Sequence, residues 1–519
     1  MSEPLRVLTS PVRAIGGLRL AQLITLVTAD AAVRALRADD RSVEWTAGVL
    51  TGDLSSQLAV EQELAREGLD RAAAGREEFV ARVRTTEADG RAHAAELLTA
   101  LGIAVDLDAG ALDGDDVALA ARTAFVRLYE AGQLVREERV VNACPRCATV
   151  VDDVDAEAGT ATASCYQLHV TTADGVPVDV ATIAVELLPG VAAVAVPDDH
   201  PAAGGVVELP VAGRAVPLIA DGERDAPAMV IPAHDPHDLE TARRYGLSPI
   251  TVLDLEGTVV APGPLEGLGR YAARAAAADL LSGEGVIEAT AEVDEAVARC
   301  RRCGTVVVPR LGRHWFLPMA DLEVLAADAV RQGAIVVTPG SAGDDLVARA
   351  GQRGDWCVSQ QVWAGQPVPV ATCADCGQVA VGVELAGSCG KCMGVLVADD
   401  DVFDARFVGA VWPLAVAGWP RDEAGPGAAA PSTLLLIAPT GLILWAVRMA
   451  ALGFRLAGAS PFARVAVHPP VDLLLYLESV GDGPDTDIDA VRAALLAGGL
   501  DVEWAADIAA SLAPAVLTD

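Results

Sequence analysis

Four CxxC pairs constrain the fold of this 519-residue chain more than any other feature of its sequence. Two of them, Cys373 with Cys376 and Cys389 with Cys392, are separated by 12 residues. That spacing is typical of a zinc ribbon, in which four thiolates surround one tetrahedral ion. Four reduced structural thiols are the alternative in a reducing compartment. The pattern predicts a small metal-braced module.

The other two pairs lie far apart but have similar flanking sequences. Cys144 and Cys147 begin CPRCATVVDD, Cys300 and Cys303 begin CRRCGTVVVP, and 152 residues separate the two pairs. Each pair continues into valines typical of a strand. We expect one zinc ion to join both pairs at the base of an inserted domain, where a clip closes a long loop. The predicted cofactor is structural Zn²⁺, with up to two ions.

The composition indicates a large globular protein whose negative charge disfavours the binding of nucleic acid. Hydrophobic residues make up 52% and charged residues 21%, and the length suggests three or four packed units. The net charge is −34 and Lys391 is the only lysine, so phosphate backbones are repelled and tRNA binding is disfavoured. The most apolar run, Ser432 to Val447, is too short for a bilayer span and predicts a buried strand followed by a helix. We expect a cytoplasmic protein with no membrane partner.

Hydrophobic periodicity changes along the chain. A strand at 7–9 and a helix at about 18–36 form a βα opening, and amphipathic helices follow from 57 to 136. Short valine-rich strands fill the segment between the separated cysteine pairs. Strands and helices alternate again after Cys392, and the tail from Asp485 has a helical pattern. These features predict a β-rich domain inserted into a split α/β domain.

Several segments together resemble one family. They read FVRLYEAGQLVREERVVNACPRCATVVDD, GDWCVSQQVWAGQPVPV, DVFDARFVGAVWPLAVAGWP and IPAHDPHD. From about Leu5 onward the chain resembles the catalytic core of class I valyl-tRNA synthetases. The resemblance implies an α/β fold, with a split Rossmann-like nucleotide-binding core, an inserted β-rich editing-like domain, zinc-ribbon modules and a short C-terminal helical region.

The resemblance also implies five segments. We expect the first half of the core with its connecting helices at 1–160, the editing-like insertion at 161–298, a connective region with zinc knuckles at 299–400, the second half of the core at 401–480, and a helical segment at 481–519. The sequence stops soon after the second half of the core, so we expect no anticodon-binding domain in it.

The nucleotide-binding motifs of the family are changed here. The family uses a His-x-Gly-His turn at the first βα junction to stabilise the transferring phosphate, and that turn aligns with Arg19, Leu20, Ala21 and Gln22. The lysine-bearing loop of the family is expected after VAVHPPVD, where the sequence reads LLLYLESVGDGPDTD with no lysine. Carboxylates in that loop would repel a triphosphate. ATP binding is therefore disfavoured. The degenerate cofactor positions are Arg19, Gln22, Gly16 and Gly48.

Two substrate-holding stretches are also altered. A Gly-x-Asp-His stretch aligns with residues 48–51, which read GVLT and lack the carboxylate for a bound amino group. A Gly-Phe-Asp stretch appears as Ala438, Pro439 and Thr440. Tryptophans and prolines of the scaffold survive, so the pattern is that of a pseudoenzyme, and no catalytic residue of the core is predicted.

The editing-like region retains part of a site. By resemblance, Asp238 within IPAHDPHD is the carboxylate that anchors a substrate amino group, beside His234, Asp235 and His237. Thr182 is the second editing candidate and Glu186 is also retained, but Ala184 replaces an arginine and Met229 a lysine. A solvated His/Asp loop and a residual ester hydrolase are both open interpretations.

Four functional hypotheses follow. The leading one is a valine-tRNA ligase-like core that no longer aminoacylates and acts as a binding or regulatory module. The second is residual aminoacyl-tRNA ligase or amino-acid activation through altered residues such as Arg19. The third is a stand-alone aminoacyl-ester hydrolase using Asp238. The fourth is a scaffold that pairs with another protein. The expected ligand is an amino acid or an aminoacyl ester.

Overall fold

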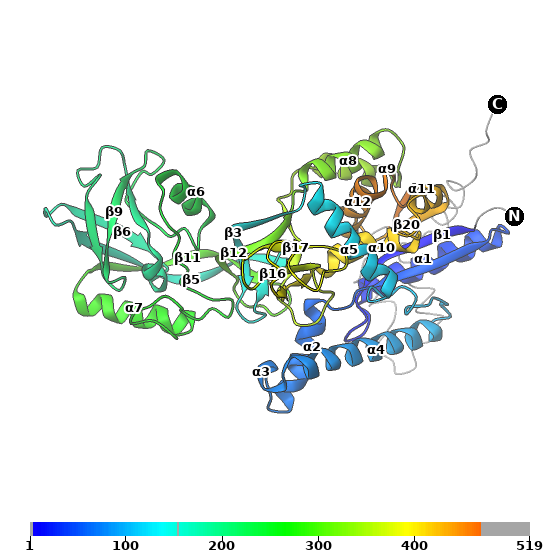
Figure 1. Cartoon of the computed structure of the whole chain (residues 1–519), viewed down its shortest axis with the longest axis horizontal. Coiled ribbons are helices and arrows are strands. Elements are labelled where there is room, and N and C mark those ends of the chain that lie inside the picture. The colour runs from blue at the N-terminus through cyan, green and yellow to red at the C-terminus, as the bar shows by residue number, and fades with distance from the viewer. Residues whose placement is uncertain (1–3, 153–154, 469–519) are drawn as a thin grey trace. The chain divides into compact units, whose positions relative to one another are not determined.

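The computed structural model describes residues 4–152 and 155–468 and divides the chain into two compact units (Figure 1). One unit contains the described residues up to Val135 and from Phe316 onward, and the other contains the described residues from Arg136 to Trp315. We call the second unit the insertion. The finer division into five segments stays a prediction.

A five-stranded parallel sheet forms the centre of the first unit. Its order is β13-β21-β20-β1-β2, and every neighbouring pair is parallel. The strands are β1 (Leu5–Val12), β2 (Val43–Val49), β13 (Val336–Thr338), β20 (Thr433–Ile437) and β21 (Arg464–Val467). Strands from before and after the insertion therefore share one sheet, which confirms the predicted split α/β core.

Helices supply the crossovers that parallel strands require. Helix α1 (Leu20–Ala38) connects β1 to β2, and its apolar side buries Val33 and Leu36 against Val7 and Leu434. The other α-helices described in this unit are α2 (Leu54–Arg66), α3 (Arg71–Ala74), α4 (Arg76–Ala100), α5 (Asp115–Glu130), α8 (Ala320–Arg331), α9 (Gly340–Arg349), α10 (Ala405–Val416), α11 (Gly425–Ala429) and α12 (Arg448–Ala457).

The long apolar run is a strand followed by a helix, as predicted. Every residue of β20 is buried, as expected for a strand covered on both faces, and a π-helical turn over Leu442–Val447 continues into α12. Across residues 4–152 and 155–468, every helix is too short or too polar to cross a bilayer.

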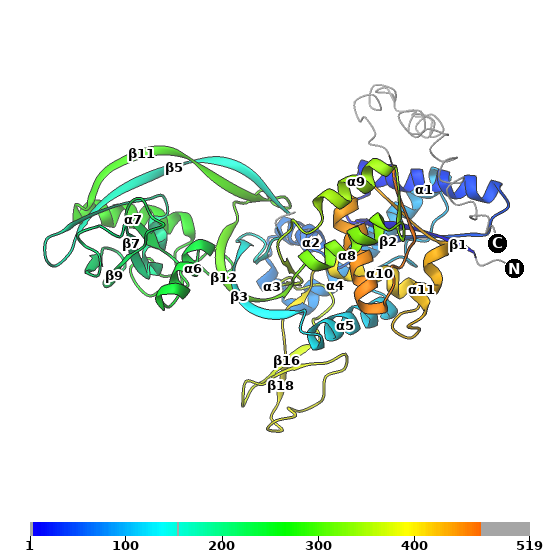
Figure 2. The same cartoon turned by 90° about the horizontal axis from the view of Figure 1, so that it is seen from above.

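The insertion is rich in strands. One sheet has the order β11-β5-β6 and the other β10-β7-β9-β8. Figure 2 shows β5 and β11 running side by side over a long distance. The strands are β5 (Ala156–Thr171), β6 (Pro177–Thr182), β7 (Ala193–Val196), β8 (Val206–Leu209), β9 (Arg214–Ala220), β10 (Ala228–Val230) and β11 (Ile287–Cys300), with helices α6 (Pro236–Tyr245) and α7 (Arg270–Glu284) and the 3-10 turn η2 (Val185–Gly190).

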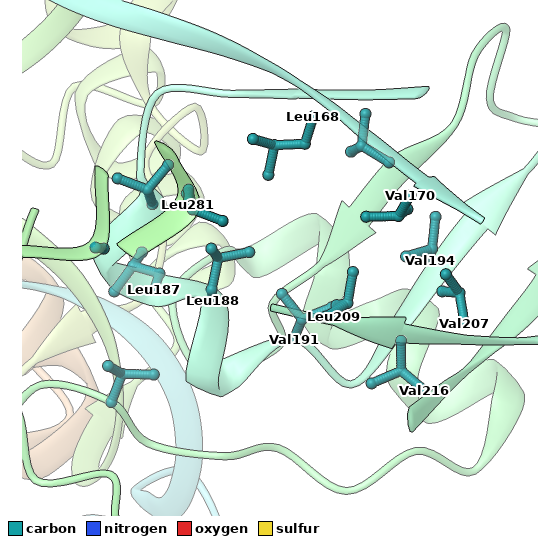
Figure 3. Close-up of a cluster of buried hydrophobic side chains, with 14 of the residues drawn as sticks. Leu168, Val170, Leu187, Leu188, Val191, Val194, Val207, Leu209, Val216 and Leu281 are labelled. Carbon is teal, nitrogen blue, oxygen red and sulfur yellow. The ribbon is translucent and has the colours of Figure 1, made fainter. Parts of the chain in front are cut away.

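Aliphatic side chains from both sheets form the core of the insertion. Figure 3 shows Leu168 and Val170 of β5 facing residues of β7, β8 and β9, including Val194, Val207 and Val216. All five side chains are buried. Alternate residues of β6 and β8 are exposed, as expected for half-buried strands.

Short strands hold the cysteine pairs. In the insertion, β3 (Val135–Cys144) pairs with β4 (Thr149–Val150), and β12 (Val308–Leu317) follows the second pair. In the first unit, β16 (Val370–Cys373) lies between β17 (Val379–Val381) and β18 (Leu396–Ala398). The segment also contains β14 (Trp356–Cys357), β15 (Ser359–Gln360) and β19 (Val402–Phe403).

Candidate functional site

The two separated cysteine pairs meet at the base of the insertion. Cys144 ends β3 and Cys147 lies in the turn before β4, while Cys300 ends β11 and Cys303 follows it. The Sγ atom of Cys303 is 3.4 Å from that of Cys144 and 3.6 Å from that of Cys147. Tetrahedral zinc with Zn–S bonds of about 2.3 Å spaces its sulfurs by about 3.8 Å. These distances fit a zinc site, and they are too long for the roughly 2 Å of a disulfide.

The close-spaced pairs form a second cluster of the same kind. The Sγ distances are 3.4 Å for Cys373 to Cys392, 3.7 Å for Cys376 to Cys389 and 3.4 Å for Cys376 to Cys392. The backbone N–H of Lys391 also points at Cys389 Sγ, at 3.4 Å. The chain thus brings together both predicted sets of four cysteines, each with ligand atoms within 4.8 Å of one another, and either set could hold zinc.

The start of α1 holds the residues predicted as degenerate nucleotide-binding positions. Arg19 precedes the helix with an exposed side chain, and its backbone N–H donates to Gln22 Oε1 at 3.0 Å. The Gln22 side chain therefore closes the first turn of the helix. Gly16 lies in the preceding loop with φ +70°, a conformation that favours glycine.

Gly48 lies in β2, away from that loop, for a packing reason. A Cβ atom there would lie 3.0 Å from Pro11 Cγ and 3.1 Å from Pro11 Cα of the neighbouring strand. The pairing of β1 with β2 shifts register between Thr9 and Val12, which brings Pro11 close. The structure thus accounts for Gly48 by close strand packing.

Two buried carboxylates, those of Asp53 and Glu87, lie near the loop that follows β2. Asp53 caps α2 by accepting from the Ser56 backbone N–H at 3.0 Å, and it forms an ion pair with Arg13. Glu87 of α4 accepts from the Gly52 N–H at 2.6 Å and from Ser56 Oγ at 2.5 Å. Burial raises the pKa of Glu87 to about 7, against the lowering effect of those hydrogen bonds. Arg13 is therefore engaged by a carboxylate at the edge of the sheet where ligands of open α/β folds bind.

Sequence reasoning missed Glu87, although a signal exists. Phe79, Val83 and Glu87 recur at every fourth residue, and all three belong to the buried side of α4. A carboxylate on an apolar helical stripe is a marker of a perturbed group.

An open cavity of 820 Å³ lies beside the loop that precedes α1. Gly16 and Gly17 line one side and residues of α4 line most of the rest. Arg82 is engaged by two carboxylates, with distances of 2.7 Å to Glu67 and 2.9 Å to Glu78. The other charged or titratable lining residues are Glu63, Asp89 and His93. The lining is therefore acidic overall and disfavours a polyphosphate.

The editing candidate Asp238 is buried in α6 and already engaged on both carboxylate oxygens. Oδ1 lies 2.7 Å from Arg224 Nη2, and Oδ2 accepts from the Ile231 backbone N–H at 2.8 Å. Burial raises the pKa of Asp238, while the Ile231 N–H and Arg224 oppose that rise. Asp235 caps the same helix by accepting from the Asp238 N–H at 3.0 Å, and His237 is exposed.

The remaining editing-like residues hold the fold of the insertion. His234 is buried, its Nδ1 is 2.8 Å from the Pro309 carbonyl, and its Nε2 accepts from the Val252 N–H at 3.1 Å. Burial lowers the pKa of His234 to about 4, so the ring is neutral and bridges two segments. Thr182 Oγ1 accepts from the Ala184 N–H at 3.1 Å.

Glu186 is fully buried in η2 and joins it to α7. Its Oε1 lies 3.1 Å from Arg270 Nε, and Arg274 contacts both oxygens at 2.6 and 2.8 Å. A bidentate pair of this kind suits a structural cross-link. Met229 of β10, which stands where the family has lysine, pairs with Val194 of β7.

Of two altered core motifs, one lies within the described residues and the other lies outside them. Ala438, Pro439 and Thr440 connect β20 to the π-helical turn; Ala438 is half-buried, and Pro439 and Thr440 are exposed. The position of the lysine-bearing loop, within 473–487, lies outside the described residues.

Comparisons with known proteins agree with this architecture. The family model of class I tRNA synthetases (I, L, M and V) matches residues 2–472. The valine–tRNA ligase of Desulfotalea psychrophila is 32% identical over 471 residues, covering 88% of this chain and 53% of the relative. That of Carboxydothermus hydrogenoformans is 31% identical over 485 residues, covering 90% and 55%.

Solved structures give a weaker match. Mycobacterium tuberculosis methionyl-tRNA synthetase in complex with methionyl-adenylate aligns with a TM-score of 0.44 and 13% identity, covering 90% of this chain and 57% of that one. The chain spans about half the length of the curated relatives it matches. The parallel sheet with its strand-rich insertion and the match over nearly all residues lead to one conclusion: the chain belongs to the class I tRNA synthetases and is a valine–tRNA ligase-like core.

Proposed function

We propose that this core does not form an aminoacyl adenylate and that it acts as a binding or regulatory module. The start of α1 carries the proposal, because this turn corresponds by resemblance to the His-x-Gly-His motif of the family. Arg19 is the only basic side chain of the four residues there, and Gln22 uses its amide oxygen to close the helix. A transferring phosphate needs preorganised donors, and one oxyanion-hole donor alone is worth about 3–4 kcal/mol of the barrier.

The charge around this turn supports the same proposal. Arg13 is paired with Asp53, and Arg82 is paired with Glu67 and Glu78. The single lysine, Lys391, lies in the second cysteine cluster. Within residues 4–152 and 155–468, the side chains around this turn therefore do not fit ATP.

The cysteine clusters fit zinc, and they belong to the scaffold. Cys144, Cys147, Cys300 and Cys303 would hold one ion, and Cys373, Cys376, Cys389 and Cys392 the other. Bound zinc would supply a structural cross-link in each case. The proposed ligand is an amino acid or an aminoacyl ester, and a protein partner is the regulatory alternative.

Pyrophosphate exchange with valine and ATP tests the proposal. A curated valine–tRNA ligase is the positive control, and the expected exchange of this chain is at background. Robust exchange by the purified chain would refute the proposal.

One observation favours a second candidate, residual amino-acid activation. The exposed Arg19 side chain at the start of a helix offers a positive charge to a phosphate. A panel of amino acids in the same exchange assay tests it, with Arg19→Ala as the variant. Exchange with any amino acid that disappears in Arg19→Ala would establish this candidate instead.

A further inference from the structure

Three adjacent strands of the insertion place one histidine and two carboxylates together on an exposed face. His169 lies in β5, Asp179 in β6 and Glu288 in β11, and these strands form the β11-β5-β6 sheet. His169 Nδ1 is hydrogen-bonded to Asp179 Oδ1 at 2.6 Å, and an ion bound by both atoms would replace this hydrogen bond. One ligand atom from each of the three residues lies within 4.8 Å of the other two.

Strand register explains why these three side chains meet. His169 is directly opposite Asp179 in the β5–β6 pair. The β5–β11 pairing shifts by one residue between Ile287 and Ala289, so Glu288 is the extra residue of a bulge. Bulges re-aim side chains, and this one brings Glu288 to the face of His169.

The opposite face of the same strands is the core, so the arrangement is rigidly supported. Leu168 and Val170 point into the apolar cluster in Figure 3, and alternation along β5 sends His169 to the other side. The side chains of His169 and Asp179 are 49% and 51% exposed, which leaves the group accessible to ions. Sites built on strands hold their geometry better than sites on loops.

The donor set points to a class of ligand. One imidazole nitrogen with two carboxylate oxygens suits zinc and related transition metals, whereas magnesium and calcium prefer oxygen donors alone. Three protein ligands also leave a coordination position for water. We infer that His169, Asp179 and Glu288 bind a divalent transition metal ion, Zn²⁺ by the chemistry of the donors. This site is independent of the cysteine clusters and of the proposed function.

Calorimetric titration of the full chain with Zn²⁺ tests the inference, after both cysteine clusters have been saturated with zinc. The titration is run in a buffer that does not chelate, above the ordinary histidine pKa of about 6.5, because the ligand must be neutral. We expect one further equivalent to bind. His169→Ala, Asp179→Asn and Glu288→Gln should each weaken it at least about tenfold, the loss that even an outer partner of a metal site causes.

Glu292→Gln is the matched control, because Glu292 is an exposed carboxylate on the same strand but outside the group. It should leave the affinity for the further zinc ion unchanged. With the third site free of metal, each variant should have the same melting temperature as the parent chain. The inference is wrong if no further equivalent binds, if His169→Ala binds as tightly as the parent chain, or if excess Mg²⁺ displaces the ion.

Discussion

Glu87 shows how a single buried carboxylate ties the stability of the core to pH. Its folded pKa of about 7 lies above the ordinary glutamate value of about 4.3, because the side chain is buried in α4. The folded state therefore holds a proton that the unfolded state has released between these values. The stabilising contribution of Glu87 to the unfolding free energy is fully present below about pH 4.3 and is lost as the pH rises through about 7.

Glu87→Gln should remove this dependence. Glutamine keeps an acceptor for the Gly52 N–H and Ser56 Oγ without a charge to bury. We expect the variant to exceed the parent chain by roughly 1–3 kcal/mol in unfolding free energy at pH 8 and to match it at about pH 4, below the unfolded pKa. Urea unfolding of the first unit at both values measures this. Glu96→Gln, at an exposed position of the same helix, should change neither value, and an equal effect of Glu87→Gln at both values would contradict the assignment.

Asp238 is a second residue whose role can be separated by mutation. Removing it leaves Arg224 without its closest carboxylate and the Ile231 N–H without its acceptor. Asp238→Ala should lower the unfolding free energy of the insertion by about 3–5 kcal/mol, the cost of breaking a buried pair. Asp225→Ala, at an exposed position nearby, should cost less than about 0.5 kcal/mol.

The same pair of variants tests the hydrolase hypothesis. The parent chain and Asp238→Ala should hydrolyse valine-specific tRNA mischarged with threonine at the same background rate. A stability loss of Asp238→Ala below about 1 kcal/mol together with a fall in hydrolysis would assign Asp238 to catalysis.

At the scale of elements, close approach of backbones fixes the edge of the core sheet. Gly110 lies against β2, and a Cβ atom added there would be 1.7 Å from the Ala47 carbonyl oxygen. The Val49 N–H donates to the Gly110 carbonyl at 2.8 Å, so the loop continues the hydrogen bonding of the strand. Neither backbone can move without breaking that bond.

Gly110→Ala should therefore destabilise the first unit by at least about 2 kcal/mol, the range of overpacked sites. Gly114→Ala is the control, since the nearest atom to its added Cβ is 3.8 Å away. Thermal unfolding compares the two, and equal melting temperatures would show that the loop yields without cost.

Sequence patterns predicted the long elements well and the short ones poorly. The strand at 7–9 and the helix at 18–36 correspond to β1 and α1, because their apolar residues recur at the periods of a strand and a helix. The strands β14, β15 and β19 have two residues each, too few for any periodicity. The pairing of β13 with β21 joins segments more than 100 residues apart and leaves no local signal.

The candidate sites divide in the same way. The cluster of Cys373, Cys376, Cys389 and Cys392 follows from local CxxC spacing, and the cluster of the two distant pairs follows from their similar flanking sequences. The meeting of His169, Asp179 and Glu288 depends on the register of three strands and on a bulge, which no spacing reveals. Likewise, the engagement of Asp238 by Arg224 depends on how α6 packs.

For the whole molecule, the two cysteine clusters would let zinc brace an acidic chain with a net charge of −34. Cys303→Ser should lower the zinc content of the cysteine clusters from two ions to one and destabilise the insertion, because structural zinc contributes folding free energy directly. Cys165→Ser is the control, since Cys165 lies in β5 outside both clusters. Metal analysis after gel filtration decides, and an unchanged zinc content in Cys303→Ser would contradict the site.

The central claim is that the residues at the core no longer neutralise a triphosphate. Calorimetric titration of the zinc-loaded chain with Mg-ATP, in the absence and presence of valine, tests it most directly. We expect no measurable heat of binding in either titration, while a curated valine–tRNA ligase binds under the same conditions. Saturable binding of ATP that strengthens with valine and is lost in Arg19→Ala would contradict the account.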